Sequence, residues 1–328
     1  MSTTSALKVA AVWLLALVLL GAGFVTAVTV LNGRLYSPEH QVGLYLDALR
    51  DGDGAKALGL LNATVPEGAN PALLDGEALR SAAAPLEDVQ VGEARDTGND
   101  HVEVPVTYLL AGSEHTTAFP LRLIDREWGF FNVWRFEETV LPTAEVSVVN
   151  SVGATVNGIA VGLPGGAASL ATFYPTVVEA EYTDEYFAAP AQQAFVVGHD
   201  SPPPALVLAT EATPQLTQAA EDQLRAFLDD CAGQTVFQPT NCPFNYPTSE
   251  RLAGSIDWSI EDYPTASITA TDGGWSLAPL RGVARIDTEL QDYFSGAIRS
   301  VSEPVPFEFG ADLLVSEDAV TVTPVVRY

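Results

Sequence analysis

Two cysteines are the residues in this sequence whose type and spacing point most directly to a specific chemistry. Cys231 and Cys242 enclose ten residues that include glycine and proline. A loop of this length can close into a disulfide, which in an exported protein would contribute roughly 3 kcal/mol, or somewhat less for so short a loop. A structural zinc site needs four ligands, and no histidine or further cysteine lies near this pair in the sequence. We therefore predict a Cys231–Cys242 disulfide.

Templates for catalysis and cofactor binding find no match. The chain contains neither a Gly-x-Ser-x-Gly elbow nor a His-Glu-x-x-His helix. Its glycine-rich turns fit neither the dinucleotide-binding spacing nor the P-loop spacing. The run that starts at Asp51 begins like a calcium-binding loop, but Lys56 and Asn62 stand where such a loop needs glycine and glutamate. We expect no catalytic residue, no metal site and no cofactor.

An aromatic group near residue 130 is the best candidate for the lining of a binding pocket. Its members are Trp128, Phe130, Trp134 and Phe136. They would line a pocket if the surrounding domain were hollow, although aromatic side chains at this spacing more often belong to a hydrophobic core. The sequence alone is compatible with both a pocket lining and a hydrophobic core.

The elements that must position these residues begin with a long apolar segment. Residues 9–31 carry no formal charge and consist mainly of Leu, Val and Ala. As a helix they rise about 34 Å, enough to cross a hydrocarbon layer of about 30 Å with modest tilt. A cleaved signal peptide is the alternative, but its apolar region usually runs about 7 to 15 residues, and the best cleavage-like triplet, Val25-Thr26-Ala27, lies inside the segment. We predict that residues 1–35 form a short cytoplasmic tail and an uncleaved transmembrane anchor.

The composition of the chain favours a location outside the cytoplasm for everything after the anchor. There are 42 acidic and 15 basic residues, giving a formal net charge of −27. Lys8 before the apolar segment and Arg34 after it nearly balance, so the flanking charges barely orient the helix. The acidic composition and the predicted disulfide instead favour a cytoplasmic N-terminus with extracytoplasmic domains. The negative charge also argues against nucleic acid as a partner.

Residues 36–140 show helices first and an antiparallel sheet afterwards. Ser37-Pro38-Glu39 is a helix start, and glycines at 52 and 54 end that helix. Further helices are expected at 55–62 and 71–84. The periodicity then changes to that of strands. The expected strands cover residues 89–94, 102–110, 116–124 and 128–136. A hairpin turn at 111–114 would leave His101 and His115 far apart, each at a solvated strand end.

This order of elements resembles the nuclear-transport-factor-two-like, or cystatin-like, cone, in which a curved sheet wraps the first helix. The segment EWGFFNVWRF, which ends at Phe136, is similar to the last strand of exported bacterial members. The resemblance implies a fold but no function, since the family includes both enzymes and inert scaffolds.

Residues 141–210 are expected to form a small β module that ends in a proline-rich link. Its strands cover 146–149, 155–156, 159–161, 168–174 and 176–180, and Asn157-Gly158 supplies a tight turn. The module resembles those of Gram-positive membrane proteins related to the teicoplanin-resistance-associated protein, which join one transmembrane helix to domains outside the cell. The excess of arginine over lysine is typical of GC-rich genomes, such as those of actinobacteria, and of high-salt habitats. The resemblance implies a role in the cell envelope.

Residues 211–328 are expected to form a C-terminal α+β domain that holds the disulfide. Thr213-Pro214 caps a helix that runs to about Cys231. About seven alternating segments follow. The clearest cover residues 255–260, 267–271, 275–278, 283–287, 305–309 and 319–325, with turns at 272–274 and 316–318.

The sequence therefore predicts an α+β protein with an N-terminal transmembrane helix, a cystatin-like domain, a small β module and a C-terminal α+β domain. The leading hypothesis is a non-catalytic, membrane-anchored envelope protein that binds, senses or scaffolds outside the cytoplasm. One alternative is a small-ligand-binding or enzymatic cone lined by the aromatic group. Another is a partner of cell-wall-synthesis proteins, for which a wide exposed apolar patch would be the sign.

Overall fold

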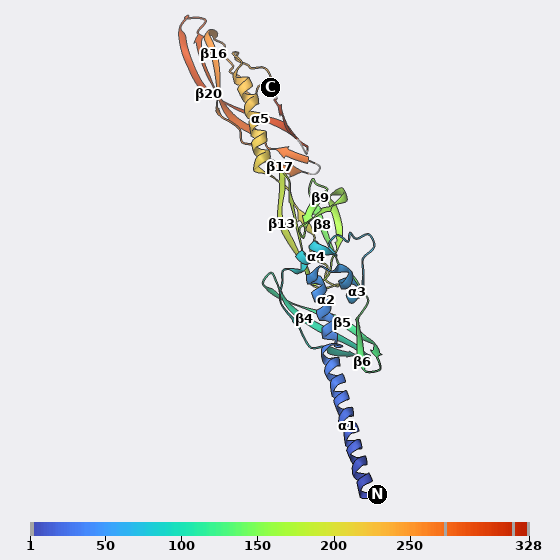
Figure 1. Cartoon of the computed structure of the whole chain (residues 1–328). Coiled ribbons are helices and arrows are strands. Elements are labelled where there is room, and N and C mark those ends of the chain that lie inside the picture. The colour runs from blue at the N-terminus through green and yellow to red at the C-terminus, as the bar shows by residue number, and fades with distance from the viewer. Residues whose placement is uncertain (1–2, 272–273, 317–318, 327–328) are drawn as a thin grey trace. The chain divides into compact units, whose positions relative to one another are not determined.

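The computed structural model describes residues 3–271, 274–316 and 319–326 (Figure 1). It is an α+β protein with a long apolar N-terminal helix and mainly strands elsewhere, which confirms the predicted class. The chain divides into two compact units. The first unit comprises Met1–Ser147, Gly153–Ala180 and Ala191–Leu206, and the second comprises Val148–Val152, Glu181–Pro190 and Val207–Tyr328. Residues 141–210 thus contribute to both units.

The first unit begins with a series of helices. These helices are α1 (Thr3–Arg34), α2 (Pro38–Asp51), α3 (Gly54–Leu61) and α4 (Gly76–Ala83). The Ser37 hydroxyl accepts a hydrogen bond from the His40 amide at 3.2 Å, and Gly52, at φ +71°, ends α2 as predicted. The helix predicted at 71–84 is shorter than expected. Gly76, at φ +64°, begins α4 instead of interrupting a longer helix.

The main sheet of the first unit is antiparallel, with strands in the order β2-β4-β5-β6 and β3 paired to β4. The strands are β2 (Leu86–Val91), β3 (Arg95–Gly98), β4 (His101–Leu110), β5 (Ser113–Glu127) and β6 (Phe131–Phe136). The β4–β5 hairpin turn is two residues shorter than expected, because Ala111 and Gly112 adopt positive φ and Leu110 pairs with Ser113 instead of His115. The strand predicted at 128–136 begins only at Phe131.

Aromatic rings fill the space between α2 and this sheet. The Tyr45 ring lies 5.7 Å from those of Phe119 and Phe136 and 6.3 Å from that of Phe173. Tyr45 and Phe119 are fully buried. Val42, Leu46 and Leu49, at helical spacing on α2, complete the buried face of the helix.

The other strands before α5 lie outside the main sheet. They are β1 (Ala63–Thr64), β7 (Thr139–Val140), β8 (Thr143–Val148), β9 (Gly153–Val156), β10 (Ile159–Gly162), β11 (Ala167–Ala171), β12 (Thr176–Thr183), β13 (Phe187–Val196), β14 (Leu206–Leu208) and β15 (Glu211–Ala212), with a 3-10 turn η1 (Pro164–Gly166). They form the sheets β10-β9-β12-β13-β15 and β11-β8-β14 and the parallel pair β1-β7. Asn157 and Gly158 make the predicted turn between β9 and β10, both at positive φ. β13 and β14 were not predicted from the sequence.

The second unit packs one long helix, α5 (Pro214–Ala232), with an antiparallel sheet in the order β16-β19-β20-β21. Its strands are β16 (Arg251–Asp262), β17 (Ile268–Thr271), β18 (Gly274–Leu277), β19 (Leu280–Gln291), β20 (Ile298–Val315) and β21 (Val320–Val325). Thr213 caps α5 as predicted, accepting from the Leu216 amide at 3.3 Å. β19 and β20 run well beyond their predicted bounds. The turns expected at 272–274 and 316–318 include residues 272–273 and 317–318, which lie outside the described residues.

Candidate functional site

α1 is the first candidate for a functional surface, since its apolar side chains have almost no cover within the protein. Among the described residues it is the helix long and apolar enough to cross a membrane, by length and composition. Leu14, Leu17, Leu20 and Val25 are each more than 60% exposed. An apolar surface on all sides and a length of this order are typical of a membrane span.

The C-terminal part of α1 contacts β6 and the turn before it. The Asn32 side chain donates a hydrogen bond to the Phe130 carbonyl at 2.7 Å and accepts one from the Asn132 amide at 3.1 Å. The rings of Phe24 and Phe130 meet edge to face with centroids 5.2 Å apart. Contacts on two levels of the helix therefore hold this part of the sheet against α1.

The turn between β5 and β6 presents aromatic side chains. We call residues Glu127–Phe131 the β5–β6 tip. Trp128 and Gly129 adopt positive φ, and the tip closes through hydrogen bonds from Gly129 N to Arg126 O at 2.9 Å and from Phe130 N to Glu127 O at 3.1 Å. Trp128 is 82% exposed and Phe130 is 50% exposed.

The structure does not bring the predicted aromatic group around one pocket. Trp128 and Phe130 lie on the exposed tip, whereas Phe136 is buried beside Tyr45. Trp134 is half-buried, and its indole Nε1 has no hydrogen-bond partner within the described structure. Trp128 and Phe130 precede β6, which begins at Phe131, whereas Phe136 is the last residue of the strand, so the length of β6 separates Phe136 from the tip.

Trp134 lines an open concave region of about 600 Å³ in the first unit. Asn32 at the end of α1, Ser37 and Glu39 at the start of α2, and Glu93 between β2 and β3 also line it. One Glu39 carboxylate oxygen accepts a hydrogen bond from the Ala94 amide at 2.8 Å, so this acid is used in holding α2 to the adjoining loop. The region is a surface hollow at the junction of α1, α2 and the sheet.

The two histidines of the β4–β5 hairpin are separated, as the sequence indicated. His101 is paired with Arg122 and lies 3.4 Å from a Glu137 carboxylate oxygen at a partly exposed strand end. The expectation of a solvated strand end is wrong for His115. Its ring stacks on that of Tyr108 with centroids 6.0 Å apart, and its Nε2 is buried with no hydrogen-bond partner in the described part of the chain. Because the hairpin turn is shorter than expected, Ser113 begins β5 and His115 lies inside the strand, paired with Tyr108.

The predicted disulfide is present in the second unit. The sulfur atoms of Cys231 and Cys242 are 2.02 Å apart, and both residues are buried. The bridge joins the last turn of α5 to the loop that leads toward β16. The indole of Trp258 donates a hydrogen bond of 2.9 Å to the Val236 carbonyl, which ties that loop to the sheet.

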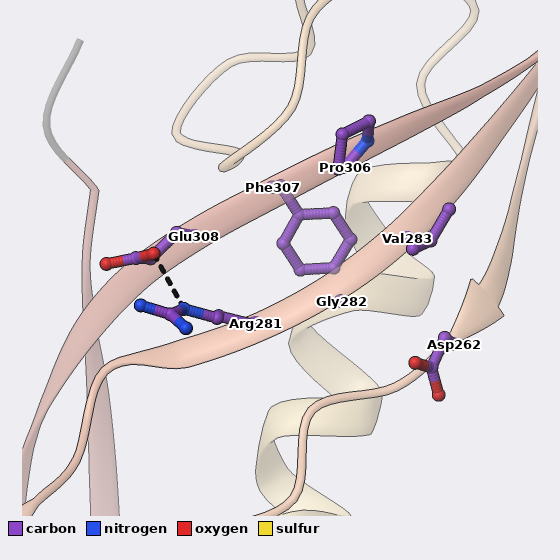
Figure 2. Close-up of a pocket in the computed structure, with 7 residues that line it drawn as sticks. All are labelled: Asp262, Arg281, Gly282, Val283, Pro306, Phe307 and Glu308. Atoms are coloured by element: carbon purple, nitrogen blue, oxygen red, sulfur yellow. Dashed lines mark hydrogen bonds and ion pairs between the residues drawn. The ribbon is translucent and has the colours of Figure 1, made fainter.

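A depression of about 430 Å³ lies on β19 and β20 of the second unit (Figure 2). Figure 2 shows the Phe307 ring beside Gly282, and an ion pair joins Arg281 Nε to Glu308 Oε2 at 2.8 Å. Both charged side chains are more than half exposed. Sequence reasoning missed this site, although an isolated glycine within an alternating strand was the available signal.

The turn between β19 and β20 carries a further exposed aromatic pair. Phe294 is fully exposed and Tyr293 is 69% exposed. The Asp292 carboxylate accepts hydrogen bonds from the Ser295 amide and hydroxyl and from the Phe294 amide, and these bonds lower the pKa of Asp292. The turn is thus held in shape while its aromatic rings project into solvent.

Among the described residues, no group of three or more His, Cys, Asp or Glu side chains is placed to hold a metal ion. The exposed apolar and aromatic surfaces are α1, the β5–β6 tip and the β19–β20 turn. Comparison of the chain with protein-family models, with curated proteins and with solved structures gives no match.

Proposed function

We propose that this protein is a single-pass membrane protein of the cell envelope, with its N-terminus in the cytoplasm and its β-rich units outside. There it binds, senses or scaffolds without catalysis. The observation that carries the proposal is the surface of α1, on which Leu14, Leu20 and Val25 are exposed, while the folded part of the first unit follows from α2 onward. Such a surface is stable in a bilayer and costly in water.

The orientation is supported by the chemistry of the second unit. A disulfide persists in oxidising compartments and is rare in the cytoplasm. Cys231 and Cys242 form such a bridge, and the net charge of −27 matches an exported, soluble ectodomain. The negative charge also disfavours nucleic acid as a partner.

We also propose a family relationship for this protein, which the order of its elements supports. α2 lies against an antiparallel sheet that ends in the aromatic strand β6, as in a nuclear-transport-factor-two-like cone. We extend this to a distant relationship with the teicoplanin-resistance-associated membrane proteins, which also follow one transmembrane helix with such modules. The proposed partners are the membrane and a protein of the envelope or of cell-wall synthesis.

A binding or scaffolding role is favoured over a cone with an enclosed reaction pocket. The rings of Tyr45, Phe119 and Phe136 fill the space between α2 and the sheet. The exposed rings of Tyr293 and Phe294 supply a contact surface of the kind that protein interfaces use.

Thiol labelling in intact cells tests the proposal. Cys231 and Cys242 are the only cysteines of the chain, so a single introduced cysteine is the only free thiol while their bridge is intact. With a membrane-impermeant maleimide, we expect Ser113→Cys to be labelled from outside and Ser5→Cys to be labelled only after the cells are opened. We also expect the chain to stay in the membrane fraction through a carbonate wash.

Two results would contradict the proposal. Release of the chain by carbonate would show that α1 is not an integral anchor. Labelling of Ser5→Cys in intact cells, with Ser113→Cys protected until lysis, would reverse the orientation. The wild-type chain is the matched control, since it should gain label only after reduction and unfolding.

A further inference from the structure

The β5–β6 tip is an aromatic surface placed beside the helix that we propose to be the membrane anchor. Trp128 is 82% exposed although it belongs to a turn with a defined hydrogen-bonded shape. Exposure of a single large aromatic side chain is common, but exposure of two on one tip, next to an apolar helix, is a pattern that needs an explanation.

The tip is fixed to α1 at two levels. At the end of the helix, Asn32 hydrogen-bonds with both Phe130 and Asn132, on either side of the start of β6. About two turns earlier, the Phe24 ring contacts the Phe130 ring. Contacts at both levels therefore fix the position of the tip relative to α1.

The position of Phe24 sets the depth of the tip. Phe24 lies seven residues before Leu31, the last residue of the apolar segment, which corresponds to about 10 Å along a helix axis. A ring in contact with Phe24 must lie at a similar level. If residues 9–31 cross the hydrocarbon layer, Phe130 reaches the boundary between headgroups and acyl chains or slightly below it.

We propose that the β5–β6 tip inserts Trp128 and Phe130 into the membrane leaflet that faces the first unit, as a second attachment beside α1. The inference rests on the proposed membrane anchoring. Tryptophan has an amphipathic ring that favours the interface between lipid and water. The amides of Gly129 and Phe130 are already hydrogen-bonded within the tip, which lowers the cost of placing its backbone among lipids.

This attachment gives the first unit a fixed orientation on the membrane. Without insertion of the tip, α1 and the unit held against it would be free to tilt and rotate together relative to the membrane. With Asn32 bound to the start of β6 and the tip inserted, the main sheet stands at a defined angle to the lipid surface. A second copy of the chain or another protein covering the tip would be a different occupant, and the experiment distinguishes these cases.

Depth-resolved fluorescence quenching on the full chain is the test. Trp128→Cys is labelled with an environment-sensitive fluorophore while the native bridge keeps Cys231 and Cys242 unreactive. The labelled chain is reconstituted into phosphatidylcholine vesicles that contain lipids with a nitroxide either near the headgroup or at the end of the acyl chain. Ser113→Cys is the matched control, because Ser113 and Glu127 are the two ends of the 15-residue strand β5, about 50 Å apart.

We expect the probe at position 128 to shift its emission to the blue and to lose emission most strongly to the shallow nitroxide, while the probe at 113 responds to neither lipid. A probe at 128 that is quenched no more than the probe at 113 overturns the inference, if the chain resists carbonate extraction. A blue shift without lipid quenching also overturns it, since a protein then covers the tip. If carbonate extracts the chain, the proposed membrane anchoring is wrong. This outcome differs from one in which the chain stays in the membrane but the probe at 128 is not quenched, which contradicts only the insertion of the tip.

Discussion

The Tyr45 hydroxyl on α2 donates a hydrogen bond of 2.6 Å to the carbonyl oxygen of Tyr174, which lies 129 residues later in the chain. Both residues are buried. The Tyr45 ring also packs near Phe173, so the segment between β11 and β12 belongs to the same core as α2. This contact explains why residues 153–180 fold with the helices and main sheet that precede them.

Tyr45→Phe tests the contribution of that bond. Removal of the hydroxyl leaves the buried Tyr174 carbonyl without this donor, and we expect a loss of about 1–2 kcal/mol in the free energy of unfolding. Chemical denaturation of the full chain in detergent micelles measures the change. Tyr293→Phe is the control, since that side chain is 69% exposed and should leave the midpoint unchanged. Equal midpoints for both variants would contradict the prediction.

The first unit should lose stability at alkaline pH. Burial raises the pKa of Tyr174 to about 12, partly offset by a hydrogen bond with Thr139, while the unfolded chain ionises near 10. The folded state keeps the proton that the unfolded state loses, so stability is constant below pH 10 and falls as pH rises from about 10 to about 12, by roughly 2–3 kcal/mol.

Tyr174→Phe removes this titration and should flatten the loss of stability between pH 10 and 12. Unfolding curves at a series of pH values, for the wild type and the variant, provide the measurement. Burial also raises the pKa of Tyr45, so part of the alkaline slope remains in the variant. An unchanged slope would contradict the prediction, because it would show that folding does not raise the pKa of Tyr174.

The disulfide should stabilise the second unit. Cys231 and Cys242 are 11 residues apart, and closing a loop of that length is worth about 3 kcal/mol through the entropy of the unfolded chain. Replacing both cysteines with alanine should lower the thermal midpoint of the second unit under non-reducing conditions. Emission of the Trp258 indole, which is bonded to the loop, is a suitable signal. The wild type in excess reductant should behave like the double variant.

Gly282→Ala should destabilise β19. A Cβ at this position would lie 2.5 Å from Phe307 Cζ and 2.6 Å from the Asp262 carbonyl oxygen. Overpacking of this kind costs about 1–3 kcal/mol. Gly310→Ala is the matched control in the same sheet, since its Cβ would meet only the Val325 carbonyl oxygen, at 3.9 Å. Thermal unfolding of the second unit should separate the two variants, and similar midpoints would count against the close contact between Gly282 and Phe307.

Several features of this protein were determined by residues close together in the sequence. Ser37 and Thr213 each bond an amide three residues ahead, so the starts of α2 and α5 could be predicted from a few letters. Asn157-Gly158 favours a tight turn through local backbone geometry alone. The long apolar segment and the pair of cysteines also needed no knowledge of the fold, because length and spacing were sufficient evidence.

Tertiary contacts decided the rest. The positive φ at Ala111 and Trp128 moved the ends of two strands, and with them the environment of His115 and the tip beside α1. Tyr45 and Tyr174 joined segments that composition had assigned to different domains. The approach of Phe130 to Phe24 links residues more than a hundred positions apart. Capping and periodicity act over a few residues and can be recognised in the sequence, whereas these contacts arise only when the whole sheet packs against the helices.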